Sequence, residues 1–227
     1  MLHYLLYDAA GLLLAAHLAL GYFLWRFGGE RKISFRLPSK RQERGWAMVP
    51  IVLMTVIAEG GVLVLGLPVW AKLYDTAPPN DSVVVDVTAE QFAWNVRYAG
   101  HDGKFGRTSS SLLSLDNAIG IDANDPAAKD DILLIGEIHL VVNRPAHIRL
   151  HSKDVLHSFF LPMQRIKQDV VPGMTNEIWF IPTKTGDYEI ACAELCGFGH
   201  YQMRGLLRVE SQEKFDAWLA DQPTLQQ

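Results

Sequence analysis

Cysteine is scarce in this chain of 227 residues, and so are the motifs that mark common classes of enzyme. The only two cysteines, Cys192 and Cys196, stand four residues apart, so no disulfide framework holds a small secreted fold together. The sequence contains no phosphate-binding glycine loop, internal repeat or basic nucleic-acid signature. Residues 1–8 hold no lysine or arginine, which excludes the charged start of a cleaved signal peptide. With 49% hydrophobic residues, the chain is too apolar to be disordered.

Charge divides the chain into two parts. Residues 1–74 carry eight Lys or Arg and four Asp or Glu, whereas residues 75–227 carry thirteen and twenty-one. A basic first part and an acidic second part indicate two environments and two domains, 1–74 and 75–227.

Two long apolar runs predict transmembrane helices at about 9–26 and 46–72. His17 is the only strongly polar residue of the first run, and Glu59 the only one of the second. Each run approaches the roughly 20 apolar residues that cross a bilayer. The alternative, two buried helices of a soluble protein, fails because nothing else in the first 74 residues could cover them. Glu59 is either a protonated group bonded to a neighbouring helix or part of a proton path, and both roles need a partner subunit.

The segment between the runs sets their orientation. Residues 26–45 hold seven basic and two acidic side chains, and short basic loops stay on the cytoplasmic side. We therefore expect a two-span protein of a bacterial plasma membrane, with both termini and the acidic domain in the periplasm.

After residue 75 the sequence changes to short β-rich runs separated by turn residues, which predict an antiparallel β-sandwich or barrel. The runs are 82–88, 92–98, 138–142, 147–151, 176–181 and 187–191. Residues 100–131 are polar and rich in aspartate, and we predict a long surface loop with a helical turn near 111–115. A short amphipathic helix is expected at 211–219.

The stretch Cys192–Met203 concentrates metal-binding chemistry. Two thiols, the imidazole of His200 and the thioether of Met203 fall within it, and soft sulfur ligands with imidazole suit copper. A mononuclear blue-copper loop needs one cysteine, whereas two thiolates can bridge two copper ions. The second imidazole must then come from elsewhere, and His157, at the end of an apolar strand, is the best candidate. His139, His147 and His151 lie on strand-like runs and are expected to be ordinary side chains.

Two other interpretations of the cysteine pair compete with copper. Two nearby thiols in an oxidising compartment can form a disulfide. Two cysteines and two histidines can also make a tetrahedral zinc site, although Met203 would then have no role.

These motifs resemble subunit II of the haem–copper cytochrome c oxidases. The resemblance rests on the Cys-x-Glu-x-Cys-x-x-x-His-x-x-Met loop, on Asp154-Val-Leu-His157-Ser-Phe, on Asp169-Val-Val-Pro-Gly173 and on two preceding spans. It implies a Greek-key, cupredoxin-like β-domain with a dinuclear copper centre, CuA, that accepts electrons from cytochrome c. The electrons pass to haem in subunit I, where oxygen is reduced to water and protons are pumped, so this chain would be an electron relay within an oxidoreductase.

The resemblance also implies a ligand set. Cys192 and Cys196 would bridge the coppers, His157 and Met203 would complete one copper, and His200 with the backbone carbonyl of Glu194 the other. The Glu194 side chain would face a magnesium ion shared with subunit I.

Further residues take roles only through the family pattern. Glu43, in Glu43-Arg-Gly-Trp46-Ala-Met-Val-Pro50, matches a residue at the mouth of a proton path, or is an ordinary acid in a first helical turn. Asp154 would dock the donor through its lysines, or belong to a solvated acidic face. Phe92 stands where the family has the tryptophan through which electrons arrive, which puts that route in doubt, while Trp94 is kept and has a packing role as its alternative.

A Cys-x-x-Cys-His haem motif is missing, so we expect the donor to be a separate cytochrome c or a haem subunit of an associated quinol-oxidising complex. Two other functions share some of these features. A membrane-anchored copper chaperone would have one span and a thioredoxin-like βαβ pattern, and a quinol-oxidase subunit would have lost the copper ligands; neither fits this sequence.

Overall fold

The computed structural model describes residues 2–29 and 37–225. These residues form two compact units, Met1–Lys72 and Leu73–Gln227. Part of the basic connecting segment, residues 30–36, lies outside the described residues.

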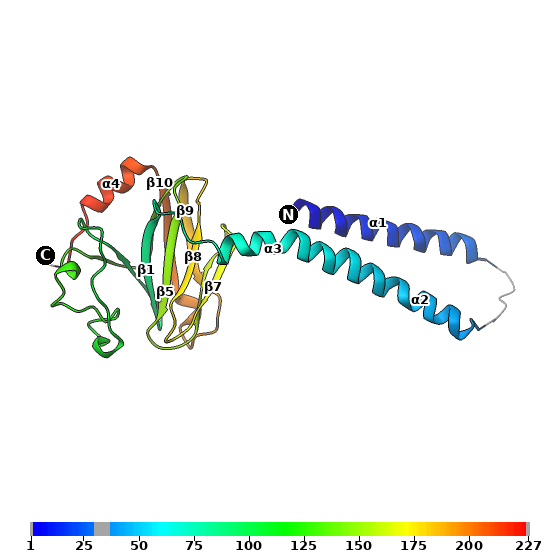
Figure 1. The fold of residues 1–227 in the computed structure, drawn as a ribbon, viewed down its shortest axis with the longest axis horizontal. Coiled ribbons are helices and arrows are strands. Elements are labelled where there is room, and N and C mark those ends of the chain that lie inside the picture. Colours follow the sequence, from blue (N-terminus) through cyan, green and yellow to red (C-terminus); the bar gives the residue numbers. More distant parts are fainter. Residues whose placement is uncertain (1, 30–36, 226–227) are drawn as a thin grey trace. The chain divides into compact units, whose positions relative to one another are not determined.

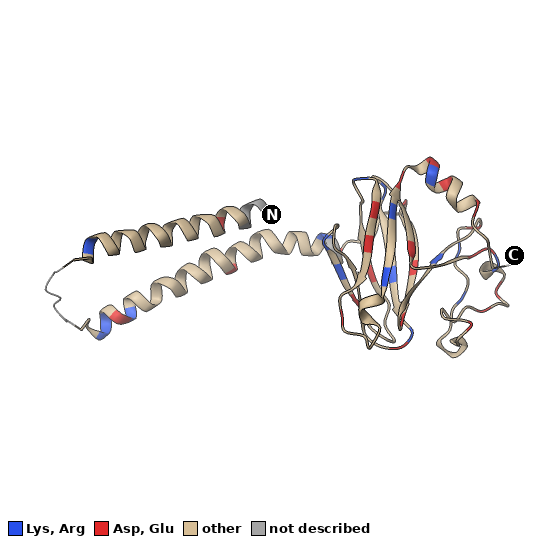
Figure 2. Cartoon of the chain, turned by 180° about the vertical axis from the view of Figure 1, so that it is seen from behind, with Lys and Arg blue, Asp and Glu red and all other residues tan. Residues whose placement is uncertain are grey.

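The first unit is helical. Helix α1 (Leu2–Phe27) is followed by a continuous helical segment made of α2 (Lys40–Leu53), a π-helical stretch (Met54–Glu59) and α3 (Gly60–Tyr74) (Figure 1). Two candidate membrane spans, Leu6–Phe27 and Lys40–Lys72, have the necessary length and hydropathy, and none of their side chains is buried. Figure 2 shows charged residues gathered at the helix ends that the loop joins and almost none between.

Local chemistry explains where the second helical segment begins. Ser39 accepts a hydrogen bond from the backbone N–H of Gln42, and the Gln42 side chain accepts one from the backbone of Ser39. This capping box starts the helix several residues before the apolar run, and Glu43 lies in its first turn. Glu59 is the last residue of the π-helical stretch.

The second unit is a sandwich of two five-stranded sheets. One sheet has the order β3-β2-β1-β5-β8 and the other β4-β10-β9-β6-β7. The strands are β1 (Val83–Glu90), β2 (Ala93–Tyr98), β3 (Ile132–Ile135), β4 (Glu137–Val141), β5 (Ala146–Ser152), β6 (His157–Leu161), β7 (Ile166–Val170), β8 (Asn176–Phe180), β9 (Gly186–Cys192) and β10 (Arg204–Glu210). Helix α4 (Gln212–Ala220) follows the last strand.

The purely antiparallel arrangement predicted from the sequence is wrong in two places. Strand β1 pairs with β5 in parallel, and β10 pairs with β4 in parallel. Both pairs join strands far apart in the chain, which a parallel connection requires. Alternation of apolar and polar residues indicates that a strand has one buried face. It does not indicate whether the neighbouring strand runs parallel or antiparallel to it.

The core lies between the two sheets. Alternate residues of β1 and β5 point into it, and Val85, Val87, Ile148 and Leu150 are fully buried. Trp94 of β2 packs edge-on against Phe159 of β6, with ring centroids 5.4 Å apart. The core therefore reaches the start of β6, where His157 stands.

The long segment between β2 and β3 covers the outer face of the first sheet (Figure 1). It contains two short 3-10 turns, Ser110–Leu112 and Pro126–Ala128, the first near the predicted helical turn. Arg97 of β2 binds Asp86 of β1 and, at 3.1 Å, Asp131 at the end of this segment. The ring of Phe105 lies under two guanidinium groups, those of Arg97 at 4.9 Å and Arg149 at 4.6 Å. Buried ion pairs and ring contacts thus hold the segment against the sheet.

Candidate metal centre

Three strand ends of the second sheet meet at the candidate site. Strand β6 begins at His157 and pairs with the end of β9 through Phe159 opposite Cys192. The loop after Cys192 returns through a 3-10 turn at His200–Gln202 to Met203, immediately before β10. Backbone hydrogen bonds close this loop: Cys192 N–H donates to Met203 O at 3.2 Å, and Ala193 N–H donates to Ser158 O at 2.9 Å. The sequence interpretation placed His157 at the end of a strand, whereas it opens one.

The sulfur atoms lie together. The two Sγ atoms of Cys192 and Cys196 are 3.8 Å apart, and the Met203 Sδ is 3.8 Å from Cys196 Sγ. His200 Nδ1 lies 3.6 Å from Cys196 Sγ, and the carbonyl oxygen of Glu194 is 3.2 Å from Cys192 Sγ. The loop therefore gathers all the donor atoms that its sequence offers.

His157 reaches the same point from β6. Its ligand atom and the two sulfurs lie within 4.8 Å of one another. The side chain is fully buried, and among the described residues its Nδ1 has no hydrogen-bond partner, whereas Nε2 is 2.8 Å from Asp154 Oδ1. A buried ring nitrogen without a partner is costly unless it has a ligand to bind. Carboxylate partners on the far nitrogen are typical of metal-binding histidines.

The two thiols have different acidities. Burial alone raises the pKa of Cys192, but the neighbouring His157 imidazole and the backbone of Ser158 and Glu194 lower it to about 6. Burial and the neighbouring Cys192 charge raise the pKa of Cys196 to about 11. Burial also opposes a charged His157, yet Cys192 and Asp154 raise the pKa of that imidazole. One thiolate therefore forms readily, and a cation would favour the second.

The turn before β2 supports the metal loop from the other sheet. The Gln91 amide donates to Cys196 O at 2.6 Å, and the Gln91 backbone N–H donates to Asp154 Oδ2 at 2.8 Å. The Phe92 ring packs on the loop so closely that a Cβ added at Gly199 would lie 2.4 Å from it. Asp154 and Gln91 together tie the two halves of the site, a function that the sequence did not reveal. The Asp-x-x-His spacing could have indicated this contact, since it places the Asp154 carboxylate three residues before the His157 ring.

This donor set fits copper better than the alternatives. The cysteines are free, and 3.8 Å is far beyond the roughly 2.05 Å of a disulfide. A zinc site of two Cys and two His would leave the Met203 sulfur, which is 1% exposed, pointing at the cluster without a role. Two thiolates, two imidazoles and a thioether are the soft set that electron-transfer copper takes.

The other predicted residues lie in different surroundings. Trp94 is fully buried, with its ring centroid 6.3 Å from that of His157, and its indole N–H has no partner. Glu43 and Glu59 belong to the helical unit. The other strand histidines have protein partners: His139 bonds Glu210 and Glu137, His147 bonds Glu177, and His151 bonds Thr175.

Comparison with known proteins gives one consistent result. The family model described as cytochrome c oxidase subunit II, periplasmic domain, matches residues 83–209. The alternative cytochrome c oxidase subunit 2 of Bradyrhizobium diazoefficiens is 35% identical over 213 residues, which cover 92% of this chain and 74% of that protein. The cytochrome c oxidase subunit 2 of Cereibacter sphaeroides is 30% identical over 209 residues, covering 87% of this chain and 67% of that protein. Among solved structures, the periplasmic domain of subunit II of the Bradyrhizobium japonicum cytochrome oxidase has a TM-score of 0.46 and 28% identity, and the similarity covers 63% of this chain and 95% of that one.

Proposed function

The chain belongs to the family of cytochrome c oxidase subunit II. On this premise we propose that its second unit, Leu73–Gln227, here called the outer domain, holds a dinuclear copper centre that relays electrons. The predicted resemblance is thereby confirmed, as is the predicted fold class of two apolar helices followed by a cupredoxin-like β-domain. The chain is therefore subunit II of a haem–copper oxidase, and the proposed site belongs to that subunit.

One observation carries the proposal: the buried, unpartnered Nδ1 of His157 lies beside the paired sulfurs of Cys192 and Cys196. We assign His157, Cys192, Cys196, His200, Met203 and the backbone carbonyl of Glu194 as the ligands. Held by these residues, a pair of copper ions would supply one-electron transfer, and the packed ligand side chains would keep rearrangement small.

The residues of the chain prepare the site for that chemistry. Asp154 holds a proton on Nε2 of His157, which leaves Nδ1 free as a ligand. Five of the six ligand groups come from the loop 192–203 and His157 comes from β6, so the complete set would leave no open position for a substrate. The buried Trp94 packs beside His157, the half-buried Phe92 packs on the metal loop, and the buried Met203 keeps its thioether away from water.

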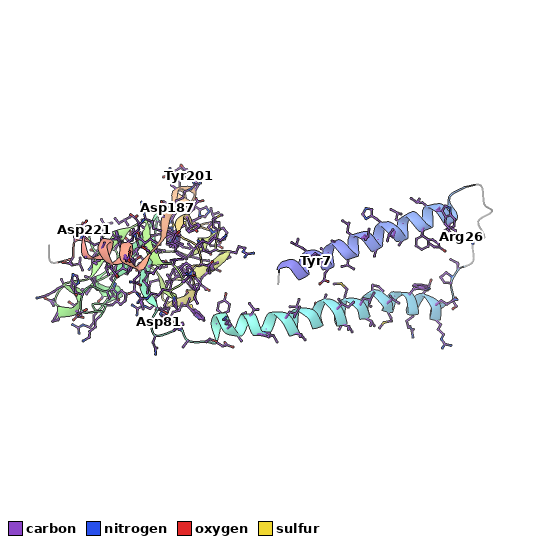
Figure 3. The ribbon with its side chains drawn as sticks, turned by 90° about the horizontal axis from the view of Figure 1, so that it is seen from above. Tyr7, Arg26, Asp81, Asp187, Tyr201 and Asp221 are labelled. Carbon is purple, nitrogen blue, oxygen red and sulfur yellow. The ribbon has the colours of Figure 1, made fainter. Side chains whose placement is uncertain are left out.

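The rim of the metal loop is apolar and exposed. Leu195, Phe198 and Tyr201 are 79%, 96% and 66% exposed, and Tyr201 projects from the edge of the outer domain (Figure 3). Exposed apolar groups of this size mark protein-binding surfaces. We propose that this rim contacts the other oxidase subunits and an electron donor, either cytochrome c or a haem subunit of a quinol-oxidising complex.

The remaining family roles extend the proposal. Electrons would leave for haem in subunit I, where oxygen is reduced to water with proton pumping, and Glu43 would lie at the mouth of a proton path. The magnesium predicted at the Glu194 side chain needs ligands from subunit I. The basic side chains of residues 26–45 support the proposal that both termini and the copper domain lie on the periplasmic side of a bacterial plasma membrane.

Copper loading of the purified chain tests the proposal. We expect about two coppers per chain and a mixed-valence species whose unpaired electron couples to both nuclei. His157→Ala should abolish this spectrum, whereas His147→Ala, which removes a strand histidine bonded to Glu177, should preserve it. A single copper with mononuclear splitting, or preferential binding of zinc, would contradict the assignment.

A further inference from the structure

A cavity of about 300 Å³ lies on the outer face of the first sheet, separate from the metal ligands. The segment 100–131 forms one wall, and β1, β2, β5 and the turn before β8 form the others. Its size is at the lower end of the roughly 300–1,000 Å³ of small-molecule sites. The residues that determine its chemistry are Thr88, Arg97, Ser110, His151, Lys153 and Thr175.

Among the residues that line this cavity, the carboxylate is that of Asp86, and it is already engaged. Both oxygens of Asp86 are bound, Oδ2 by Arg97 and Oδ1 by Arg149. Burial alone would raise the pKa of Asp86, but His151, Arg149 and Arg97 lower it to about 2, so this carboxylate is fully ionised and fully paired. A cation entering the cavity would find its acid already neutralised by two guanidinium groups.

The unused hydrogen-bonding groups of the cavity lining are donors. The side chain of Arg97 is only 4% exposed, and its two terminal nitrogens are bound by Asp86, Asp131 and the Gly106 carbonyl. Its Nε–H has no hydrogen-bond partner within the part of the chain that the structure describes. Lys153, 18% exposed, spends one of its three N–H groups on Glu90 at 2.6 Å. The hydroxyl groups of Thr88 and Ser110 line the same space. A buried donor without an acceptor is costly, and it marks a place where an acceptor is expected.

We propose that this cavity binds a small oxyanion, a phosphate or a carboxylate. An oxyanion offers several acceptor oxygens and charge-assisted bonds to Arg97 and Lys153. A site for an anion is unusual in this domain, because residues 75–227 carry eight more acidic than basic groups. A neutral polyol would use the hydroxyl groups but would gain nothing from the two cationic ones.

Thermal unfolding of the full chain in detergent, with sodium phosphate added at constant ionic strength, tests the proposal. A ligand that binds only the folded state raises the unfolding temperature in a saturable manner. We expect Lys153→Gln to weaken the apparent phosphate affinity about tenfold and Thr88→Val about threefold. Thr88→Val keeps the shape of the side chain, so it reports on the site even if loss of the Lys153–Glu90 pair disturbs folding.

Lys104→Gln is the matched control, because it removes an exposed charge from the same segment outside the cavity lining. Parallel titrations with acetate and glycerol identify the class of ligand. Saturable effects of phosphate or acetate that fall in the Lys153 and Thr88 variants support the proposal and name the oxyanion. Stabilisation by glycerol alone, equal phosphate effects in all four proteins, or no saturable effect overturns it. Copper-free and copper-loaded protein should behave alike, so this result is independent of the metal assignment.

Discussion

The carboxylate of Asp154 and the imidazole of His157 are joined by a 2.8 Å hydrogen bond between Oδ1 and Nε2. The same carboxylate accepts the backbone N–H of Gln91, so one side chain links the β1–β2 turn to a metal ligand. The family pattern suggests donor docking for Asp154, yet its side chain is only 29% exposed and is committed inward.

Replacing the Asp154 carboxylate distinguishes a role in orienting His157 from a role in docking the donor. Asp154→Asn should lower copper affinity about 10- to 100-fold and alter the copper spectrum, because the ring loses the negative charge of its orienting acceptor. Competition titration against a copper chelator measures the affinity. Asp187→Asn, at an exposed position on β9, is the control. An unchanged spectrum with slower reduction by the donor would instead support docking alone.

The packing of Phe92 on the metal loop gives a second prediction. Gly199→Ala should displace the loop and reduce bound copper, because the new Cβ would lie 2.4 Å from the Phe92 ring, an overpacking that costs about 1–3 kcal/mol. Adding Phe92→Val should restore copper binding by making room. Gly45→Ala, where a Cβ meets nothing within 4 Å, should have no effect. A double variant no better than Gly199→Ala would refute this contact.

The lowered pKa of Asp86 predicts how the free energy of unfolding depends on pH. Its pKa is about 2 in the folded protein and near 3.8 without the fold, so pairing stabilises the fold above pH 4 and this contribution disappears as pH falls through about 2. The shift corresponds to about 2 kcal/mol. Urea unfolding between pH 5 and pH 2 should show the loss. Arg149→Gln should move it to higher pH, whereas Arg208→Gln, which removes an exposed pair with Glu137, should not.

Trp94 and Phe92 can be compared as routes for electrons. Trp94 is fully buried, so a donor cannot touch it, and Trp94→Phe should leave the rate of copper reduction by cytochrome c unchanged. Phe92 is only partly buried beside the metal loop, and Phe92→Leu should slow the reaction. Stopped-flow measurement on copper-loaded protein decides between them. The reverse ranking would make Trp94 the route.

Much of this fold was predictable because patterns repeat locally. The spans, the runs that became β1, β2, β4, β5, β8 and β9, and α4 follow from apolar runs and alternation. Strands β3, β6, β7 and β10 lie outside the predicted set. Strand β3 directly follows the polar segment, the strand near His157 was expected to end at that residue and not to begin there, and β7 and β10 carry charged residues at exposed or half-buried positions. Parallel pairing also escaped prediction, since it depends on which distant strand becomes the neighbour.

The site divides in the same way. Spacing alone revealed Cys192, Cys196, His200 and Met203, because they share one loop. His157 needed an argument from the number of imidazoles, and its true position at the start of β6 needed the fold. The contact between Gln91 and Cys196 spans 105 positions of the chain, and local sequence carries no trace of such a pair.

The parallel pairing of β10 with β4 has a consequence for biogenesis. The last metal-binding side chain directly precedes β10, and that strand is fixed only when it lies between β4 and β9. With the proposed periplasmic location, a thiol that has already emerged would wait in an unfinished domain until residue 210 has crossed the membrane. Delivery of the proposed copper would then come after export and folding, and the waiting thiols would have to stay reduced in the meantime.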